Sequence, residues 1–507
     1  MKRYAGVLLP VTSLPSKYGI GCFDQAAYDF VDWLQKAGQR YWQILPLGAT
    51  SYGSSDDSPY QAYSAFAGNP YLISLDALVE EGVLTREECD GVSFGDNPAK
   101  VDFDKLHEHR FALLRKAYER SGISANPDYQ NFIRDNGWWL NDYALFMALK
   151  TFFHDQPFRA WPEDIRMHWG FALEHYNREL YFDIEFQKYM QFKFNQQWSR
   201  LKAYANGKHI QIVGDIPIYV SPDGADVWAH PELFQLDAHN APTAIAGCPP
   251  DAFAEDGQAW GNPLYNWNFH RATDYAWWVS RMWYSFKLYD VVRIDHFRGF
   301  DTYWAIPADS ATAKTGKWEN GPGMELFDAL EQALGQLPII AEDLGELFPS
   351  VRKLLADSTF PGMKVLQFAF SGGDNEYLPH NHVKNGVVYP GTHDNTTITA
   401  WWESAATPKE KATAAAYLHL TGAHPTAKEV AAVKTADART ALLRAALGSV
   451  ADRAIIPMYD WLGLGEEAHL NTPGKLGGNW AWRAAAGFES KTLAKTIADE
   501  CSVYCRV

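Results

Sequence analysis

The sequence predicts an α/β protein built as a (β/α)8 TIM barrel with large insertions on the C-terminal, active-site face. Eight short apolar segments occur in order along the 507 residues, with helix-like stretches between many of them. Eight strands alternating with helices is the strand count of such a barrel. Three of the eight segments end in acidic residues, and a barrel gathers its functional side chains at these strand ends. A doubly wound open sheet is the alternative arrangement.

Each expected strand is a run of apolar and β-branched residues that ends in polar ones. The eight runs are Gly6–Leu14, Tyr41–Leu47, His209–Val220, Val291–Phe297, Pro338–Leu344, Met363–Phe370, Val387–Asp394 and Arg453–Leu462. Helices are expected at Asp24–Gly38, Met324–Gly335 and Val351–Asp357. In the first of these, Asp24 is suited to cap the start and Gly38 to stop the end.

Two of the connections between expected strands are long. Residues 65–205, after the second strand, have a mainly helical pattern, and residues 221–288, after the third, are rich in proline, glycine and aromatic residues. Loops that follow barrel strands build the C-terminal face, so both insertions are expected to wall a cleft there. We therefore expect residues 1–507 to form a single catalytic barrel.

Composition excludes several classes of partner. Lysine and arginine number 45 against 61 aspartates and glutamates, and the net charge of −16 repels nucleic acid and anionic lipid. No apolar run reaches the roughly 18 residues that a membrane helix needs, and Pro10 interrupts the only segment that resembles a signal peptide. Five scattered cysteines fit free thiols in a reducing cytosol, so a cytoplasmic location is expected.

Aromatic residues make up 15% of the chain, which is unusually high. They could form a tryptophan-rich core or present flat platforms to ligands such as sugar rings, and composition alone does not separate the two.

The acids at three strand ends indicate glycosidic chemistry. Asp295, Glu342 and Asp394 should converge at the barrel mouth, where a carboxylate pair suits cleavage with one nucleophile and one proton donor. Strand alternation places Arg293 on the same face as Asp295, so the guanidinium can hold that carboxylate ionised. The same alternation turns Asp343 away from Glu342. Capping or ion pairing is the alternative role for any single acid.

Other chemistries lack their motifs. The sequence has no complete dinucleotide-binding fingerprint, Walker A loop, zinc-protease helix or nucleophile elbow. The histidine pairs His107/His109 and His380/His382 are expected to be solvated surface rather than metal ligands. Neither a cofactor nor a metal is expected.

Several motifs between Gly6 and Arg483 resemble those of the 4-α-glucanotransferases, the amylomaltases or disproportionating enzymes of glycoside hydrolase family 77 in the α-amylase clan. They are Ser58-Pro59-Tyr60-Gln61, Ser64 to Pro70, Gly214-Asp215-Ile216-Pro217, Pro249 to Pro263, Arg293 to Gly299, Ala341 to Gly345 and Gly391 to Asn395. The segment that ends in Trp260-Gly261-Asn262-Pro263 is among the most specific to the family.

The resemblance implies a retaining double displacement on α-1,4-glucans. Asp295 would be the nucleophile that forms a glucosyl-enzyme intermediate, and Glu342 the general acid that later acts as base. Asp394 would bind sugar hydroxyls and favour a distorted, oxocarbenium-like ring. The substrate-binding residues implied by the resemblance are Tyr60, Asp215, Trp260, Arg293, His296, His393 and Asn471.

The resemblance also assigns particular contacts to some of these residues. Tyr60 would stack on the sugar ring that is attacked, and the loop from Asp251 to Trp260 would cover the acceptor side. The chain departs from the family pattern at Tyr459, where a glutamine is expected, and near His469, where an arginine is expected, which weakens the assignment of Asn471.

The predicted function is a cytoplasmic 4-α-glucanotransferase that moves maltosyl or longer segments between α-1,4-glucans, with maltooligosaccharides and glucose as donors or acceptors. Two alternatives remain open. An α-amylase-type hydrolase would share the first half-reaction but resolve the intermediate with water instead of a sugar hydroxyl. A catalytically silent glucan-binding protein would keep only the aromatic cleft.

Overall fold

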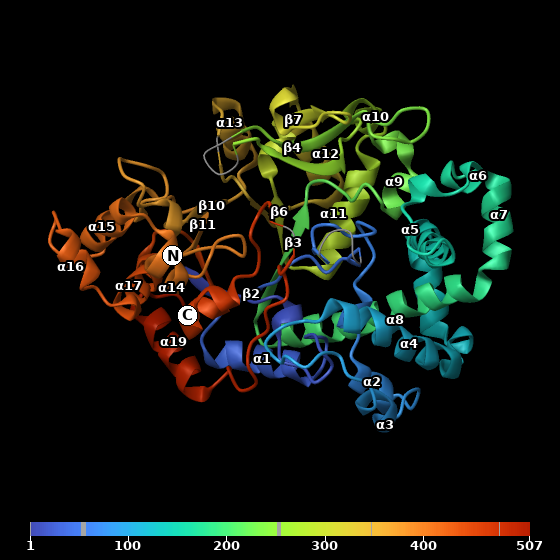
Figure 1. Ribbon diagram of the computed structural model, residues 1–507, viewed down its shortest axis with the longest axis horizontal. Coiled ribbons are helices and arrows are strands. Elements are labelled where there is room, and N and C mark those ends of the chain that lie inside the picture. Colours follow the sequence, from blue (N-terminus) through green and yellow to red (C-terminus); the bar gives the residue numbers. More distant parts are fainter. Residues whose placement is uncertain (1, 52–56, 251–254, 346, 476) are drawn as a thin grey trace.

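The computed structural model describes residues 2–51, 57–250, 255–345, 347–475 and 477–507. At its centre is a parallel eight-stranded sheet in the order β10-β11-β12-β1-β2-β3-β6-β9 (Figure 1). Its strands are β1 (Tyr4–Leu8), β2 (Tyr41–Gln43), β3 (Gln211–Pro217), β6 (Val291–Asp295), β9 (Ile339–Ala341), β10 (Gly362–Val365), β11 (Gly386–Tyr389) and β12 (Arg453–Pro457).

The two end strands of this sheet lie next to each other. The N–H of Ala341, the last residue of β9, donates to the carbonyl of Pro361, just before β10, at 3.0 Å. The sheet is therefore a near-closed barrel, with strands that follow one another in chain order around it. This confirms the predicted (β/α)8 barrel, and the open doubly wound sheet is wrong.

Most strands end earlier than the sequence suggests. β1 stops at Leu8, two residues before Pro10, and β11 stops at Tyr389, directly before Pro390. Proline has no N–H for the hydrogen-bond ladder, which favours these ends. β12 ends at Pro457 and is followed by helix α18 (Met458–Leu462), while β10 passes into a 3-10 helix. Asp394 consequently lies on a loop after β11 rather than on the strand.

Helices cover the outside of the barrel. They include α1 (Gln25–Lys36), α11 (Ala276–Leu288), α12 (Met324–Leu334), α13 (Pro349–Ser358), α14 (Ile398–Ala400), α15 (Pro408–Tyr417), α16 (Ala427–Ala431), α17 (Thr435–Gly448) and α19 (Lys491–Val503). The three helices expected from the sequence are present as α1, α12 and α13. Asp24 caps α1 by accepting the N–H of Ala26 at 3.1 Å, and Gly38 follows its end with a φ of +67°.

The chain between β2 and β3 is helical and forms the right-hand side of Figure 1. It contains α2 (Leu75–Glu80), α3 (Arg86–Asp90), α4 (Phe103–Ser121), α5 (Pro127–Phe152), α6 (Glu163–Arg166), α7 (Gly170–Glu179) and α8 (Tyr181–Gly207). The long helix α8 leads directly into β3. Treating residues 65–205 as an insertion into one barrel domain remains our proposal for this region.

The connection between β3 and β6 contains a second, antiparallel sheet that the sequence analysis did not predict. Helix α9 (Ala225–Ala229) precedes β4 (Ala244–Cys248) and β5 (Gln258–Pro263), and α10 (Trp267–Ala272) follows. These two strands join β7 (Thr302–Pro307) and β8 (Lys317–Asn320) in the order β5-β4-β7-β8. This sheet carries Trp260 on its edge strand.

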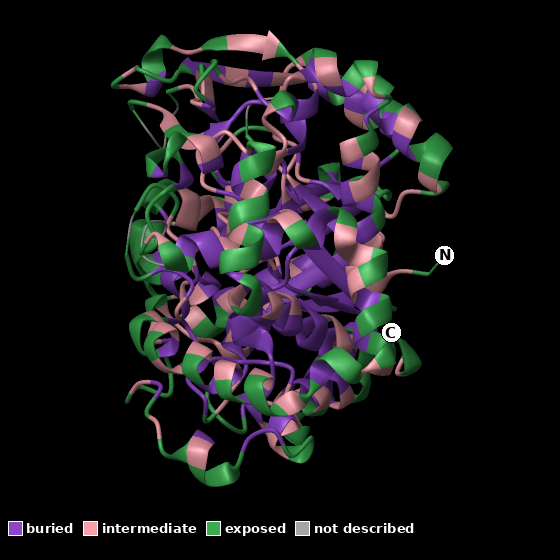
Figure 2. Ribbon diagram, turned by 90° about the vertical axis from the view of Figure 1, so that its right-hand side faces the viewer, coloured by how far each residue is buried: buried purple, intermediate pink, exposed green. Residues whose placement is uncertain are grey.

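Buried residues fill the barrel and its contacts with the surrounding helices (Figure 2). Trp42, Trp198, Trp228 and Trp278 are among the largest fully buried side chains, so part of the aromatic content is core. Inside β3, a Cβ on Gly214 would lie 2.1 Å from Cγ of Tyr289, so only glycine fits there. None of the described helices is both long and apolar enough to cross a membrane.

Candidate active site

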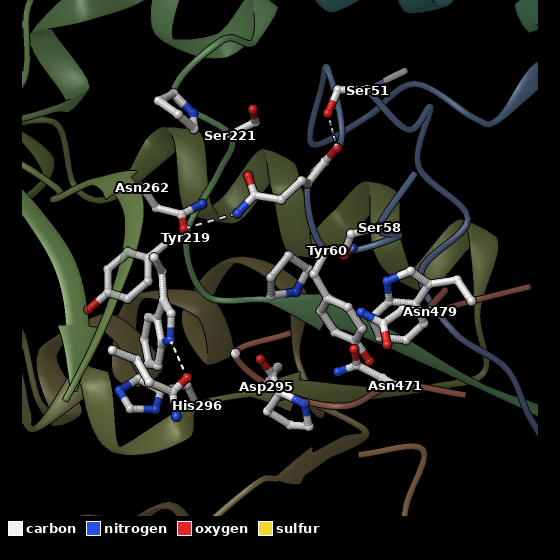
Figure 3. A pocket seen from close by; sticks show the side chains of 18 of the residues that line it. Ser51, Ser58, Tyr60, Tyr219, Ser221, Asn262, Asp295, His296, Asn471 and Asn479 are labelled. Carbon is white, nitrogen blue, oxygen red and sulfur yellow. Dashed lines mark hydrogen bonds between the residues drawn. The ribbon is translucent and has the colours of Figure 1, made fainter. Parts of the chain in front are cut away.

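A pocket of about 640 Å³ opens at the C-terminal ends of the barrel strands. Six of the residues singled out from the sequence line it: Tyr60, Trp260, Asp295, His296, Asp394 and Asn471. Figure 3 shows Asp295 near the centre, with His296 and Tyr219 on one side and Tyr60 and Asn471 on the other. Asp215, Arg293 and His393 are buried and hydrogen-bonded to lining residues. Glu342 is not among the lining residues but accepts the N–H of the lining residue His296, so the predicted residues lie together.

Asp295 is the last residue of β6 and is paired with Arg293. Nη2 of Arg293 lies 3.0 Å from Oδ1 of Asp295, and Nη1 lies 2.6 Å from Oδ2 of the fully buried Asp215. The predicted shared face of Arg293 and Asp295 is therefore present. Burial nevertheless raises the pKa of Asp295 to about 6, because the Arg293 charge does not offset burial together with the repulsion from Asp215 and Asp394. The carboxylate is ionised only above this pH.

Glu342 directly follows β9 and is held by backbone groups. Its Oε2 accepts the N–H of His296 at 2.7 Å and its Oε1 accepts the N–H of Leu344 at 2.8 Å. His296 has a φ of 55°, in a region that non-glycine residues seldom adopt, and this turn presents its N–H to Glu342. Burial and the nearby Asp295 raise the pKa of Glu342 to about 7.

The pKa of Asp394 is lowered, whereas those of Asp295 and Glu342 are raised. Its Oδ2 lies 3.3 Å from Nε2 of His393, and its Oδ1 accepts a hydrogen bond from Nδ2 of Asn471 at 2.6 Å. Burial would raise the pKa of Asp394, but the charge of His393 and both hydrogen bonds outweigh it and hold that pKa well below its ordinary value. Asn471 thus contacts the site despite the sequence departures around it.

Tyr60 connects the two halves of the pocket. Its hydroxyl donates to Oδ2 of Asp215 at 2.9 Å and lies 2.8 Å from Nε2 of His393. Its ring stacks on His393 with centroids 5.4 Å apart, and Trp480 lies 5.6 Å away. A continuous hydrogen-bonded chain therefore joins Asp295, Arg293, Asp215, Tyr60, His393, Asp394 and Asn471. Stacking of Tyr60 on a sugar remains a prediction.

The other side of the pocket is an aromatic wall made of Trp260, Tyr219 and His296. The ring of Trp260 meets that of His296 edge-on at 4.9 Å and lies 6.4 Å from Tyr219. Burial lowers the pKa of His296 to about 3, so its imidazole is neutral at ordinary pH. The start of the loop assigned to the acceptor side, including Asp251, lies outside the described residues.

The sequence analysis missed Tyr219 and Trp480. Tyr219 lies four residues beyond Asp215 and two beyond the end of β3, where side chains face the mouth of a barrel, and this position was its signal in the sequence. Trp480 has a φ of 59°, a conformation that depends on its surroundings and leaves no mark in the sequence.

The histidines do not form a metal site in the described part of the chain. Within the described ranges, no group of three or more His, Cys, Asp or Glu side chains is arranged to hold a metal ion. His382, expected at the surface, is buried instead, with Nδ1 2.7 Å from Oγ of Ser449 and Nε2 2.9 Å from the carbonyl of Tyr377. It is a packed core residue.

Comparison with known proteins agrees with this site. The model of the glycoside hydrolase 77 family, described as 4-alpha-glucanotransferase, matches residues 9–488. The chain belongs to this family. It is 44% identical to the 4-alpha-glucanotransferase of Clostridium butyricum, covering 98% of this chain and 99% of the relative. It is 46% identical to that of Streptococcus pneumoniae strain TIGR4, covering 100% and 98%.

A solved relative has the same fold over the whole length. The amylomaltase of Streptococcus agalactiae, solved in complex with acarbose, superimposes with a TM-score of 0.93 at 40% identity and covers 100% of both chains. The predicted family and its glycosyl-transferring activity as a 4-α-glucanotransferase are therefore confirmed, and the α-amylase-type hydrolase is not favoured.

Proposed function

We propose that the chain transfers a segment of an α-1,4-glucan to the 4-OH of an acceptor glucose or glucan, with Asp295 as nucleophile and Glu342 as acid and base. One observation carries this assignment. Asp295 ends β6 and Glu342 follows the neighbouring strand β9, and each influences the ionisation of the other. The pKa is raised to about 6 for Asp295 and to about 7 for Glu342. Arg293, 3.0 Å from Oδ1 of Asp295, favours the charged form of that acid, and the charge of Asp295 favours the protonated form of Glu342, as a nucleophile and a general acid require.

In the first half-reaction a carboxylate oxygen of Asp295 attacks C1 of the donor sugar. The bond from C1 to the glycosidic oxygen breaks, and that oxygen takes the proton of Glu342 as the leaving chain departs with a free 4-OH. The product is a glycosyl ester on Asp295 and an ionised Glu342. The N–H groups of His296 and Leu344 stabilise that anion.

In the second half-reaction the ionised Glu342 removes the proton from an acceptor 4-OH. The acceptor oxygen attacks C1, the ester bond to Asp295 breaks, and the anomeric configuration is retained after two inversions. Both carboxyl groups return to their starting protonation. These steps move no electrons to a redox partner and call for no metal or cofactor.

Asp394 supports the positive charge that develops on the sugar ring in each transition state. Its depressed pKa keeps it ionised throughout the working pH range. Tyr60 and Asn471, which share the pocket wall with it, would bind the ring face and hydroxyls of the same sugar.

Transfer in place of hydrolysis requires that the acceptor side favour a sugar over water. The aromatic wall of Trp260, Tyr219 and His296 supports this, because an apolar surface beside the glycosyl ester binds a pyranose face and displaces ordered water. A silent binding protein would have no use for the paired raised pKa values.

The proposed donors and acceptors are α-1,4-glucans, maltooligosaccharides and glucose. The amylomaltase of Streptococcus agalactiae was solved in complex with acarbose, which supports a saccharide as ligand of this chain. We also propose a cytoplasmic location with neither nucleic acid nor membrane as partner, in keeping with the net charge of −16.

Incubating the purified protein with maltotriose alone tests this function. A ladder of longer and shorter chains at a constant number of reducing ends is expected for transfer. Rising reducing ends without longer chains would mean hydrolysis, and an unchanged substrate would mean a binding protein.

A further inference from the structure

A second pocket, of about 280 Å³, lies where helices α5, α9, α10 and α11 meet. Figure 1 shows these helices gathered between the helical side of the molecule and the barrel. The pocket shares no lining residue with the catalytic pocket. None of its residues takes part in the proposed mechanism.

The walls of this second pocket are largely aromatic. The aromatic residues that line it are Phe66, Trp138, Trp139, Phe269 and Trp277. Trp138 is 42% exposed although it is a large apolar side chain. Phe66 meets Trp138 nearly at right angles at 4.8 Å and Trp277 at 6.0 Å, so the buried Phe66 fixes both indoles. Rigid, partly exposed indole faces are suited to stack on the apolar face of a sugar ring.

Polar residues also line the pocket. They are Ser64, Asp142 on α5, Asp226 on α9, His230 after α9, Thr273 after α10 and Ser280 on α11. Oδ1 of Asp142 lies 3.5 Å from Nε2 of His168, and Nδ1 of His230 lies 3.5 Å from Oε1 of Glu232, so neighbours orient both side chains. The hydroxyls of Thr273 and Ser280 donate to the carbonyls of Phe269 and Ala276, at 3.0 Å each, so they and the Asp142 carboxylate offer acceptors to sugar hydroxyls.

The lining offers an anion no strong cationic partner. Asp142 and Asp226 are its acidic members, and no lysine or arginine is among the described residues that line it. Burial raises the pKa of Asp226, and Glu232 raises the pKa of His230, so neither group acts as a fixed charge. A neutral, amphipathic ligand with hydroxyl edges fits this lining better than a nucleotide or a phosphosugar.

We propose that this pocket is an accessory site that holds one or two glucose units of an α-glucan chain. The proposal rests on the glucan specificity of the proposed function. A volume of about 280 Å³ is near the lower end of the roughly 300–1,000 Å³ typical of small-ligand pockets, in keeping with a short stretch of chain.

A short stretch of the sequence contributes residues to both the accessory pocket and the catalytic pocket. A small cavity of about 50 Å³ is lined by Tyr60, which also lines the catalytic pocket, and by Ser64 and Phe66, which also line the accessory pocket. A long glucan held at the accessory site therefore stays at high effective concentration near the cleft. A short oligosaccharide cannot profit from this tethering, so the site should favour long chains.

Binding is measured on the Asp295→Asn protein, in which turnover is blocked, by calorimetric titration with maltoheptaose. Two binding events per chain are expected. Adding Trp138→Ala should weaken one of them at least tenfold. Ser280→Arg, which puts a long side chain into the pocket while keeping Trp138, should do the same. A single event in the parent, or superimposable titrations for parent and variants, would overturn the proposal.

Trp283→Ala is the matched control. Trp283, on α11, is 40% exposed and so matches Trp138 on α5, but it lies under Lys287 at 3.4 Å and does not line the pocket. The control should leave both events unchanged. If Trp283→Ala and Trp138→Ala weakened maltoheptaose binding equally, the loss of any exposed indole would explain the effect. That result would contradict the proposal.

Kinetics separate this inference from the proposed function. In the otherwise native enzyme, Trp138→Ala should raise the KM for amylose at least fivefold more than the KM for maltotriose. If native protein makes no ladder from maltotriose, the proposed function fails whatever the titrations give. If the ladder forms but the two KM values shift equally, only the accessory site fails.

Discussion

Nη1 of Arg293 lies 2.6 Å from Oδ2 of Asp215, and both side chains are almost completely buried behind the pocket. Because Arg293 also binds Asp295, the charge of Asp215 competes for the same guanidinium. It also raises the pKa of Asp295 directly. The nucleophile's ionisation is therefore set partly by a residue that does not line the pocket.

Asp215→Asn should move the acid limb of kcat/KM to lower pH. The substitution keeps the shape and an acceptor for Tyr60 and Arg293, but it removes a negative charge, so the pKa of Asp295 falls from about 6. The pH dependence of kcat/KM for maltotriose measures this, since it reports ionisation in the free enzyme. An acid limb that stays in place or rises would show that Asp215 does not act on Asp295.

Glu342→Gln should remove the basic limb, which in the native enzyme lies near the pKa of about 7. Activity on maltotriose should fall about 10²–10⁴-fold, the usual contribution of a general acid. The first-turnover burst of fluoride from an α-maltosyl fluoride should be affected far less, because fluoride leaves without protonation and the base role of Glu342 belongs to the second half-reaction. Asp295→Asn serves as the control, since it should lose both activities. Equal losses on the two substrates would argue against the acid role.

Tyr459→Phe should lower kcat about tenfold with little change in KM. Tyr459 stands where the family pattern has a glutamine, and its buried hydroxyl donates to the carbonyl of Thr392 at 3.0 Å, two residues before Asp394. Losing that bond leaves the Thr392 carbonyl with the N–H of Asn395 at 3.2 Å and frees the segment that carries Asp394 to shift. A loss of about 1.4 kcal/mol of transition-state stabilisation corresponds to a tenfold lower rate.

Tyr129→Phe is the control for that experiment. It removes a comparable bond from a buried tyrosine to Glu185, at 3.1 Å, in the helical segment between β2 and β3. Both variants should lose about 1–2 kcal/mol of unfolding free energy in denaturant titrations. Only Tyr459→Phe should lose kcat, and a normal kcat there would mean that Tyr459 is merely structural.

Asp460→Asn should become increasingly stabilising, relative to the native chain, as pH rises from about 4 to about 7. Burial raises the pKa of Asp460 to about 7. Its Oδ1 accepts the N–H of Ile398, while its Oδ2 has no hydrogen-bond partner among the described residues. In this window the unfolded chain has lost the proton that the folded chain keeps, so native stability falls as pH rises. Thermal unfolding at pH 5 and 8 measures the difference, and a constant difference would contradict the account.

The sequence predicted the barrel and its acids because both depend on local pattern. The pair Arg293 and Asp295 needs only two-residue alternation on one strand, and the motif around Glu342 follows from where β9 ends. The expected place of Asp394 on a strand was wrong, because β11 ends before Pro390 and a loop carries the acid to the pocket, while its role stays a prediction.

The remaining features depend on contacts between distant segments. The sheet β5-β4-β7-β8 pairs strands across the barrel strand β6, which no local periodicity records. The hydrogen bond from Tyr60 to Asp215 joins residues 155 apart in the sequence. The raised pKa of Asp295 likewise differs from the expectation drawn from Arg293 alone, because burial is a property of the whole fold.

The most direct test of the mechanism is to trap the glycosyl-enzyme and locate it. The native protein is treated with a fluorinated α-glucosyl fluoride that slows the second half-reaction, then digested and analysed by mass spectrometry. The mechanism predicts one sugar ester per chain on the carboxyl group of Asp295 and none in the Asp295→Asn protein. A sugar on Asp394 or Glu342, or turnover with no labelled protein at any time, would contradict it.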